Sequence, residues 1–303
     1  MYEEFYGFTE RPFALLPDPA FLYLSQDHGM ALTLLRYSLI NKQGFTVITG
    51  EVGAGKTTLI NRLLDEMDDD ITVGLINFTH NAFGELSEWV LMAFGLEYRN
   101  KSKVEIYDDF VNFLIEEYRQ GRRVVLVIDE AQNMEPRMLE EVRMLSNVNA
   151  QKDYLLHLIL VGQPELRTIL QKPELRQLTQ RVSVYYHLGE LSLVEAQAYI
   201  RHRMQVVGGD PGTFDDQAIE MIWKESGGVP RIINTLCDLA LVYGFSAGRK
   251  IISADTAQEV LADRNKMSLI SGSLPLETDA AEWGADDELP ASDPDFPGGH
   301  GGH

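Results

Sequence analysis

The chain has 303 residues, 45% hydrophobic and 24% charged, which suits one large globular domain or two smaller ones. Its 26 Lys and Arg residues face 46 Asp and Glu, a net charge of −20 that argues against general binding to nucleic acid or anionic membrane. Residues 271–303 hold eight acids and neither Lys nor Arg, so residues 1–270, with 26 basic and 38 acidic side chains, carry −12.

The single cysteine, Cys237, excludes an internal disulfide and a cysteine-based zinc site, and its apolar helical surroundings predict a buried thiol. The N-terminus lacks the basic start and apolar run of a signal peptide. No apolar stretch reaches the ~20 residues that span a bilayer. We therefore expect a cytoplasmic protein without a membrane span of its own.

Three regions follow one another along the chain. Residues 1–189 alternate strand-like and helix-like segments, and residues 190–267 show helical periodicity only. Residues 268–303 are rich in Gly, Pro, Ser and Asp and show no periodicity. We expect an α/β core, a small all-helical domain and a disordered acidic tail, because the last region has too little apolar surface to offset the entropy of ordering.

Five short apolar runs in the first region predict strands: Phe45–Thr49, Ile71–Asn77, Val124–Asp129, Leu155–Gly162 and Val182–His187. Continuous apolar character indicates burial on both faces of a parallel sheet. The amphipathic segments between them predict helices: Lys56–Met67, Glu85–Phe94, Val104–Gln120 and Pro136–Asn147. This alternation predicts a five-stranded parallel α/β sheet with right-handed crossovers, whose ligands bind at the carboxyl ends of the strands.

The first strand leads into a segment that fits Gly-x-x-x-x-Gly-Lys-Ser/Thr, which we call the phosphate loop: Gly50, Glu51, Val52, Gly53, Ala54, Gly55, Lys56, Thr57 and Thr58. Its glycines let backbone amides wrap around an anion, and the following helix adds the positive end of its dipole. Lys56 can reach the β- and γ-phosphates, and the Thr57 hydroxyl can ligate Mg²⁺. The flanking strand and helix disfavour the alternative, a glycine turn with a chance lysine, so the motif predicts binding of ATP with Mg²⁺.

The third predicted strand ends in two carboxylates, Asp129 and Glu130. An Asp here can hold the Mg²⁺ shell, and a Glu one residue later can polarise a water for attack on the γ-phosphate. A solvated turn is the alternative, which the phosphate loop upstream disfavours. The intervening strand–helix unit, residues 71–120, distinguishes P-loop ATPases with an added central strand from simpler kinases and GTPases.

Further motifs accompany these two: Phe5-Tyr6-Gly7-Phe8, Pro17-Asp18-Pro19, Asp129-Glu-Ala-Gln132, Gly162-Gln-Pro-Glu-Leu166, Gln180-Arg181 and Gly228-Val-Pro-Arg231. In this combination, residues 1–266 resemble the AAA+ ATPases of the general secretion pathway protein A (ExeA) type. More narrowly, they look like the ATPases found with exosortase/PEP-CTERM (XrtA) exopolysaccharide loci and mannose-sensitive pilus systems. The resemblance implies a nucleotide-binding core over residues 1–189, which includes an N-terminal strap across the base, and a lid over residues 190–267.

The resemblance also implies roles for three more residues. Gln163 would orient the attacking water as sensor 1, with a simple turn amide before Pro164 as the alternative. Arg181 would be the arginine finger that reaches the γ-phosphate of a neighbouring subunit, and Arg176 competes for that role. Arg231 would be the lid arginine called sensor 2, unless it is an ordinary exposed residue at a helix start.

A Mg²⁺-dependent ATPase that acts as an oligomeric switch is therefore implied, since a finger completes the site of another subunit. Its expected setting is an envelope secretion, exopolysaccharide-export or pilus system, reached at the inner membrane through a membrane partner. Secretion members of the family continue into a membrane segment and a peptidoglycan-binding domain, whereas this chain ends in an acidic tail, which favours the exosortase-locus type.

Two alternatives remain open. A DNA-binding ATPase regulator similar to the transposition proteins Mu B or TniB would need a basic surface. Its candidates lie in an acidic body, which makes nucleic acid the less favoured partner: Arg99, Lys101, Lys103, Arg119, Arg122 and Arg123. The other alternative is a nucleotide-bound scaffold with negligible turnover.

Five histidines show no metal-ligand spacing: His28, His80, His157, His187 and His202.

Overall fold

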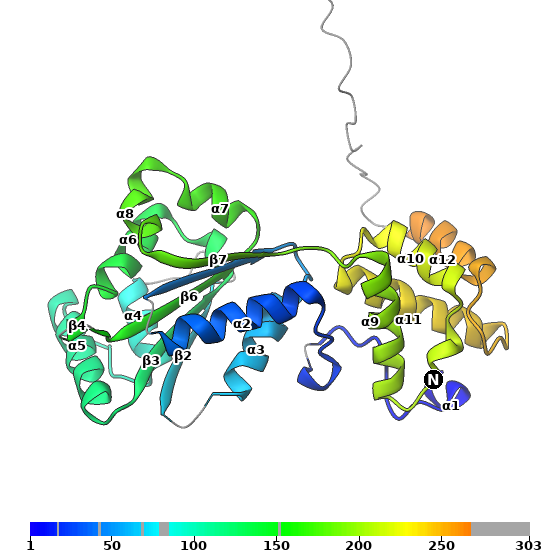
Figure 1. Ribbon diagram of the computed structural model, residues 1–303, viewed down its shortest axis with the longest axis horizontal. Helices are drawn as coiled ribbons and strands as arrows, with labels where there is room; N and C mark the ends of the chain where they lie inside the picture. The colour runs from blue at the N-terminus through cyan, green and yellow to red at the C-terminus, as the bar shows by residue number, and fades with distance from the viewer. Residues whose placement is uncertain (17, 42–43, 68–69, 79–84, 151–152, 268–303) are drawn as a thin grey trace, which may run out of the picture. The chain divides into compact units, whose positions relative to one another are not determined.

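Five parallel strands form the central sheet in the order β2-β3-β6-β1-β7 (Figure 1). Their bounds are β1 Phe45–Gly50, β2 Ile71–Asn77, β3 Arg123–Asp129, β6 Leu156–Gly162 and β7 Val182–Leu188. The predicted five-stranded parallel sheet is confirmed, and each predicted strand is present with ends that differ by at most one residue. Two further strands, β4 (Asn149–Ala150) and β5 (Asp153–Tyr154), pair antiparallel outside this sheet.

The computed structural model describes residues 1–267 except for residues 17, 42–43, 68–69, 79–84 and 151–152. Residues 1–266 form one unit by their internal contacts. The predicted disordered tail and His80 lie outside the described residues.

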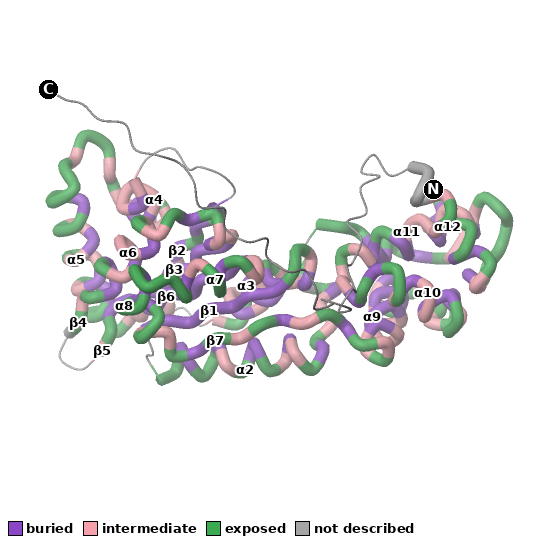
Figure 2. Tube along the Cα trace, turned by 90° about the horizontal axis from the view of Figure 1, so that it is seen from above, coloured by how far each residue is buried: buried purple, intermediate pink, exposed green. Residues whose placement is uncertain are grey.

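The sheet is buried on both faces because helices cover each of them. Helices α2 (Gln26–Ile40) and α3 (Lys56–Asp65) pack on the face that receives Ile48, Val127 and Val161. The other face receives Val47, Ile128 and Leu160, and five helices cover it: α4 (Leu86–Ala93), α5 (Lys103–Arg119), α6 (Pro136–Leu145), α7 (Glu165–Leu170) and α8 (Arg176–Thr179). Figure 2 shows the central strands as largely buried, which explains their continuous apolar sequences.

Helix α2 has no counterpart among the predicted segments. It begins after Ser25, whose hydroxyl accepts a hydrogen bond from the His28 backbone N–H. Its exposed side includes Met30, Tyr37 and Ile40. Apolar residues therefore lie on both its buried and its exposed sides, and the 3.6-residue pattern that marks an amphipathic helix is weak.

The C-terminal helices are α9 (Leu193–Val206), α10 (Asp216–Ser226), α11 (Pro230–Ser246) and α12 (Ala254–Met267). They share one hydrophobic cluster with aromatic residues from the N-terminal segment, residues 1–25, among them Tyr2, Phe8 and Phe13. The N-terminal segment, which includes the short helix α1 (Glu3–Tyr6), therefore packs with these helices. Cys237 is fully buried in this cluster, and burial raises the pKa of its thiol.

Four single-turn 3₁₀ helices complete the described elements: η1 (Pro19–Phe21), η2 (Ala131–Asn133), η3 (Pro173–Leu175) and η4 (Pro211–Thr213). Of the helices in the described part of the chain, none is both long enough and apolar enough for a membrane crossing.

Candidate nucleotide site

The phosphate loop joins the carboxyl end of β1 to the first turn of α3. Gly53 and Gly55 have φ angles of +85° and +96°, which side chains other than glycine rarely tolerate. The loop closes with a hydrogen bond of 3.1 Å from the Ala54 N–H to the Glu51 carbonyl oxygen. This backbone and the N-terminus of a ten-residue helix form the kind of concavity that binds anions.

Lys56 lies inside this loop, with 6% of the residue exposed. Its Nζ donates to the carbonyl oxygens of Gly50 at 2.7 Å and Glu51 at 2.9 Å. Burial lowers the pKa of Lys56, and the carboxylates of Glu130 and Asp129 oppose that shift. The ammonium group is thus held by carbonyl oxygens at the start of the loop. Binding of a phosphate there would replace these hydrogen bonds with bonds to phosphate oxygens.

The loop and the end of β3 meet at Thr57 and Asp129. Thr57 Oγ1 donates to Asp129 Oδ2 at 2.8 Å, and the Glu130 N–H donates to Asp129 Oδ1 at 2.8 Å. A hydroxyl and a buried carboxylate side by side suit Mg²⁺, which takes one or two protein oxygens together with water and substrate phosphate. In the described part of the chain no three His, Cys, Asp or Glu side chains cluster as a self-sufficient metal cage. These residues therefore fit a magnesium ion that is shared with a nucleotide.

Two glutamines hold the carboxylate of Glu130. Its Oε2 accepts hydrogen bonds from Gln132 Nε2 at 2.6 Å and from Gln163 Nε2 at 3.2 Å. The Gln163 N–H also donates to Gln132 Oε1 at 2.9 Å. The structure thus brings Glu130 and Gln163 together. It adds Gln132, for which the sequence motifs indicate no role, although its position two residues after Glu130 in Asp-Glu-Ala-Gln is a signal.

The N-terminus of α11 touches the phosphate loop. The Arg231 N–H donates to the Gly53 carbonyl oxygen at 3.3 Å, and a Cβ built on Gly53 would lie 2.3 Å from Arg231 Cβ. The Arg231 residue itself is exposed. Its guanidinium group is therefore available at the edge of the loop.

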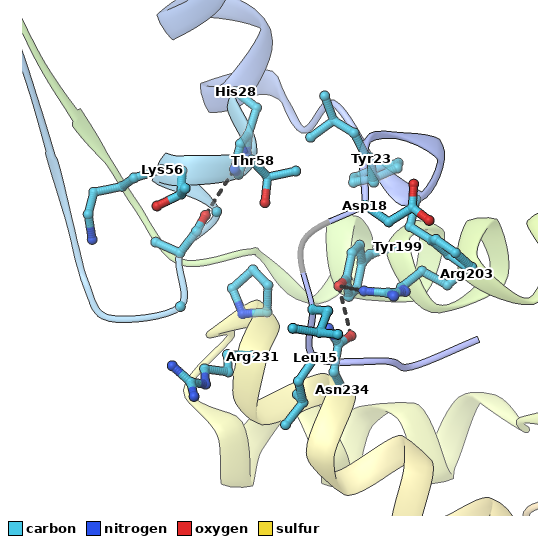
Figure 3. Close-up of a pocket in the computed structure, with 18 of the residues that line it drawn as sticks. Leu15, Asp18, Tyr23, His28, Lys56, Thr58, Tyr199, Arg203, Arg231 and Asn234 are labelled. Atoms are coloured by element: carbon cyan, nitrogen blue, oxygen red, sulfur yellow. Dashed lines mark hydrogen bonds between the residues drawn. The ribbon is translucent and has the colours of Figure 1, made fainter. Parts of the chain in front are cut away.

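A cavity of about 390 Å³ extends from the phosphate loop to α9 and α11 (Figure 3). Arg203 is one of its buried walls and donates to the carbonyl oxygens of Pro12 at 2.5 Å and Ala14 at 3.2 Å. It also donates to the Tyr199 hydroxyl at 2.9 Å, which in turn donates to Asn234 Oδ1 at 2.7 Å. This network joins the N-terminal segment to both helices.

His28 links the start of α2 to the phosphate loop. A carbonyl oxygen can only accept, so His28 Nε2 donates to Ala54 O at 2.9 Å and Nδ1 accepts from Ser25 Oγ at 2.7 Å. Burial lowers the pKa of His28, which favours this neutral ring. The sequence alone marks His28 as an ordinary histidine, because its partner in the loop is distant along the chain.

Arg181 lies far from the phosphate loop of its own chain. It precedes β7, whose Val182 pairs with Phe45 at the amino end of β1, while Leu188 pairs with Gly50 at the carboxyl end. The length of β1 separates the two ends by about 17 Å. Arg181 Nη1 donates to Ser146 Oγ at 3.0 Å, and Arg176 is exposed on α8. Neither arginine lines the cavity beside the phosphate loop.

The basic residues proposed for DNA binding are mostly paired with acids. Five of the six form ion pairs: Lys101 with Asp109, Lys103 with Glu85, Arg119 with Glu116, Arg122 with Glu117 and Arg123 with Asp70. The sixth, Arg99, lies over the ring of Tyr98. Their charge is therefore largely neutralised within the chain.

Residues 40–170 match the family described as the AAA domain. General secretion pathway protein A of Aeromonas hydrophila is 38% identical over 277 residues, which make up 90% of this chain and 51% of that protein. The chain thus spans about half the length of this curated relative.

Solved structures share the fold at low sequence identity. The ORC2 protein of Aeropyrum pernix, in ADPNP–ADP complexes, is 16% identical with a TM-score of 0.63, over 84% of this chain and 72% of that one. Cdc6p from Pyrobaculum aerophilum is 16% identical with a TM-score of 0.62, over 82% and 71%. The ORC1 protein of Aeropyrum pernix, in complex with DNA, is 15% identical with a TM-score of 0.61, over 86% and 71%.

Proposed function

We propose that this chain, which matches the AAA-domain family over residues 40–170 and is similar to general secretion pathway protein A, binds ATP with Mg²⁺ and hydrolyses it. The observation that carries the proposal is a continuous hydrogen-bonded path from Thr57 through Asp129 and Glu130 to Gln163. This path supports the proposal because a hydroxyl, two carboxylates and an amide lie within hydrogen-bond reach of one another at the end of the phosphate loop. These are the groups that phosphoryl transfer to water requires.

Each group has one task in this proposal. Lys56 and the loop amides bind the β- and γ-phosphates, while Thr57 and Asp129 hold the shell of Mg²⁺. When bound, Mg²⁺ neutralises the charge that develops on the phosphate oxygens. Glu130 takes the proton of the attacking water, and Gln163 orients that water.

Arg231 and the walls of the cavity would couple the nucleotide to the C-terminal helices. Arg231 is exposed at the start of α11, next to Gly53, which supports a contact between its guanidinium and the γ-phosphate in this proposal. Tyr23 and Tyr199 line the same cavity and offer aromatic surface to a base. Residues 190–267 then act as a lid on the core formed by residues 1–189, and the N-terminal segment shares the hydrophobic cluster of that lid.

Oligomerisation is part of the proposal. Arg181 lies away from the phosphate loop of its own chain, and neither Arg181 nor Arg176 lines the cavity beside that loop, so in this proposal either would stabilise a γ-phosphate in a neighbouring subunit. An oligomer that is completed in this way would switch its geometry as ATP is hydrolysed.

The kinship with general secretion pathway protein A supports a role in an envelope secretion system with a membrane partner. The narrower assignment to an exosortase-associated exopolysaccharide locus stays part of this proposal. Exosortase and glycosyltransferase genes beside the gene for this chain would support that setting, and a transposase gene would contradict it.

The ion pairs weigh against the DNA-binding alternative. Phosphate binding by the five paired residues would first have to break their bonds to carboxylates. The structural likeness to a DNA-bound ORC1 protein shows the fold alone.

Phosphate release by the wild type and by Glu130→Gln tests the proposal, together with titration of a fluorescent ATP analogue. We expect turnover by the wild type, loss of at least about 100-fold in the variant, and similar nucleotide affinity in both. Equal phosphate release by the two proteins, with affinity intact and with a membrane partner present, would support the low-turnover scaffold instead.

A further inference from the structure

We infer that Gln132 is a positioning residue for hydrolysis, which holds the Glu130 carboxylate so that one chosen oxygen faces the attacking water. The inference rests on the proposed ATPase function. It concerns a residue that binds neither nucleotide nor metal in that proposal and acts only through Glu130 and Gln163.

The amide of Gln132 bridges two strands of the site. Its Nε2 donates to Glu130 Oε2 at 2.6 Å, directly after β3, and its Oε1 accepts from the Gln163 N–H at 2.9 Å, directly after β6. Since β3 and β6 are neighbours in the sheet, this one side chain ties together the ends of two adjacent strands.

The amide of Gln132 packs closely against Gly162 at the end of β6. A Cβ built on Gly162, the last residue of β6, would lie 2.9 Å from Gln132 Oε1. The amide therefore occupies the space that a side chain at residue 162 would need. Gln132 itself belongs to η2, a single 3₁₀ turn that begins directly after Glu130.

The two amides distinguish the oxygens of Glu130. Gln132 Nε2 and Gln163 Nε2 both bind Oε2, the second at a longer 3.2 Å, so Oε1 is the oxygen left to take a proton. Glu130 also has a φ of +56°, a left-handed conformation that is unfavourable outside glycine and persists where its surroundings hold it. Without Gln132, only the longer bond from Gln163 would orient the carboxylate.

Only glutamine combines the reach, the donor and the acceptor that this position uses. Methionine keeps the length of the side chain and removes both hydrogen bonds. Glutamate keeps the shape but turns the donor into an acceptor and places a second carboxylate against Glu130. We therefore expect Gln132→Glu to be impaired at least as strongly as Gln132→Met.

Steady-state phosphate release, ATP-analogue affinity and thermal unfolding of the full chain test the inference. Misplacing a general base by about 1 Å costs on the order of 100-fold in rate, so Gln132→Met should lower kcat by about 10–100-fold with Kd within about threefold. The control Gln205→Met, at an exposed position of α9, should retain wild-type kcat. Because Gln132 acts through Glu130, adding Gln132→Met to Glu130→Gln should lower kcat no further.

The outcomes separate the two levels of the argument. An active wild type with an equally active Gln132→Met variant overturns the positioning role alone, as does a variant that loses affinity while kcat is kept. A further loss of rate on the Glu130→Gln background overturns it too, because Gln132 would then act independently of Glu130. A wild type that releases no more phosphate than Glu130→Gln overturns the ATPase function and this inference together.

Discussion

Gly53 is the point at which α11 rests on the phosphate loop, and its replacement by alanine tests that contact. Its φ is +85°, and a Cβ there would lie 2.3 Å from Arg231 Cβ. Carbon atoms in contact prefer about 3.5–4.0 Å, so α11 or the loop must shift by more than about 1 Å. Such a shift also breaks the hydrogen bond from the Arg231 N–H to the Gly53 carbonyl oxygen.

The expected magnitude has three contributions. The left-handed backbone costs about 1–2 kcal/mol for a residue other than glycine. Overpacking adds about 1–3 kcal/mol, and the lost hydrogen bond about 0.5–1.5 kcal/mol, partly within the same relaxation. We expect Gly53→Ala to lower the free energy of unfolding by about 2–5 kcal/mol. Gly95→Ala is the matched control, since Gly95 has a φ of +70° and a Cβ built there would meet nothing within 4 Å, and it should cost only about 1–2 kcal/mol.

Denaturant unfolding and titration with a fluorescent ATP analogue measure the two consequences. A loop pushed out of shape should bind ATP at least about tenfold more weakly, equivalent to about 1.4 kcal/mol, while Gly95→Ala should keep its affinity within about twofold. If Gly53→Ala unfolds with the same free energy as Gly95→Ala and binds ATP as the wild type does, α11 does not press on the loop and the reasoning is wrong.

Two further predictions concern pH and the oligomer. Burial lowers the pKa of His28 below 6.5, so its contribution to stability is complete above pH 6.5 and is lost as the pH falls from there toward the folded-state pKa. His28→Gln should therefore flatten the fall of Tm between pH 7 and pH 5, and an unchanged pH dependence of Tm in this variant would contradict the prediction. If Arg181 is the arginine finger, Arg181→Ala and Glu130→Gln should each lose phosphate release. A mixture of the two variant proteins should recover part of it, because each supplies the group that the other lacks. Recovery in a mixture of Arg176→Ala with Glu130→Gln instead would assign the role to Arg176.

Much of the sheet could be predicted because the burial of its strands is visible in their amino-acid sequences. Strands covered on both faces must be apolar at successive positions, and β3 and β6 show this almost without interruption. Helix α2 was not predicted, because exposed Met30, Tyr37 and Ile40 obscure the 3.6-residue spacing of its buried apolar residues. The bounds of the phosphate loop followed from glycine and lysine spacing, which backbone geometry dictates locally.

Contacts between residues distant in the chain could not be predicted in that way. His28 bonds to the loop across 26 positions, Gln132 to Gln163 across 31, and Arg203 to Pro12 across 191. None of these partners belongs to a local pattern with a spacing of its own. Their positions depend on the strand order and on how the C-terminal helices pack with the N-terminal segment.

The sequence by itself determined which groups could bind phosphate and metal, because Lys56, Thr57, Asp129 and Glu130 stand at strand ends that a parallel sheet must bring to one edge. Only the tertiary structure decided how those groups are held. It placed two amides on one oxygen of Glu130, pressed Arg231 against Gly53, and set Arg181 at the far end of β7. The physical reason is that a strand end fixes where a side chain begins, whereas its orientation depends on hydrogen bonds from residues that packing alone brings near.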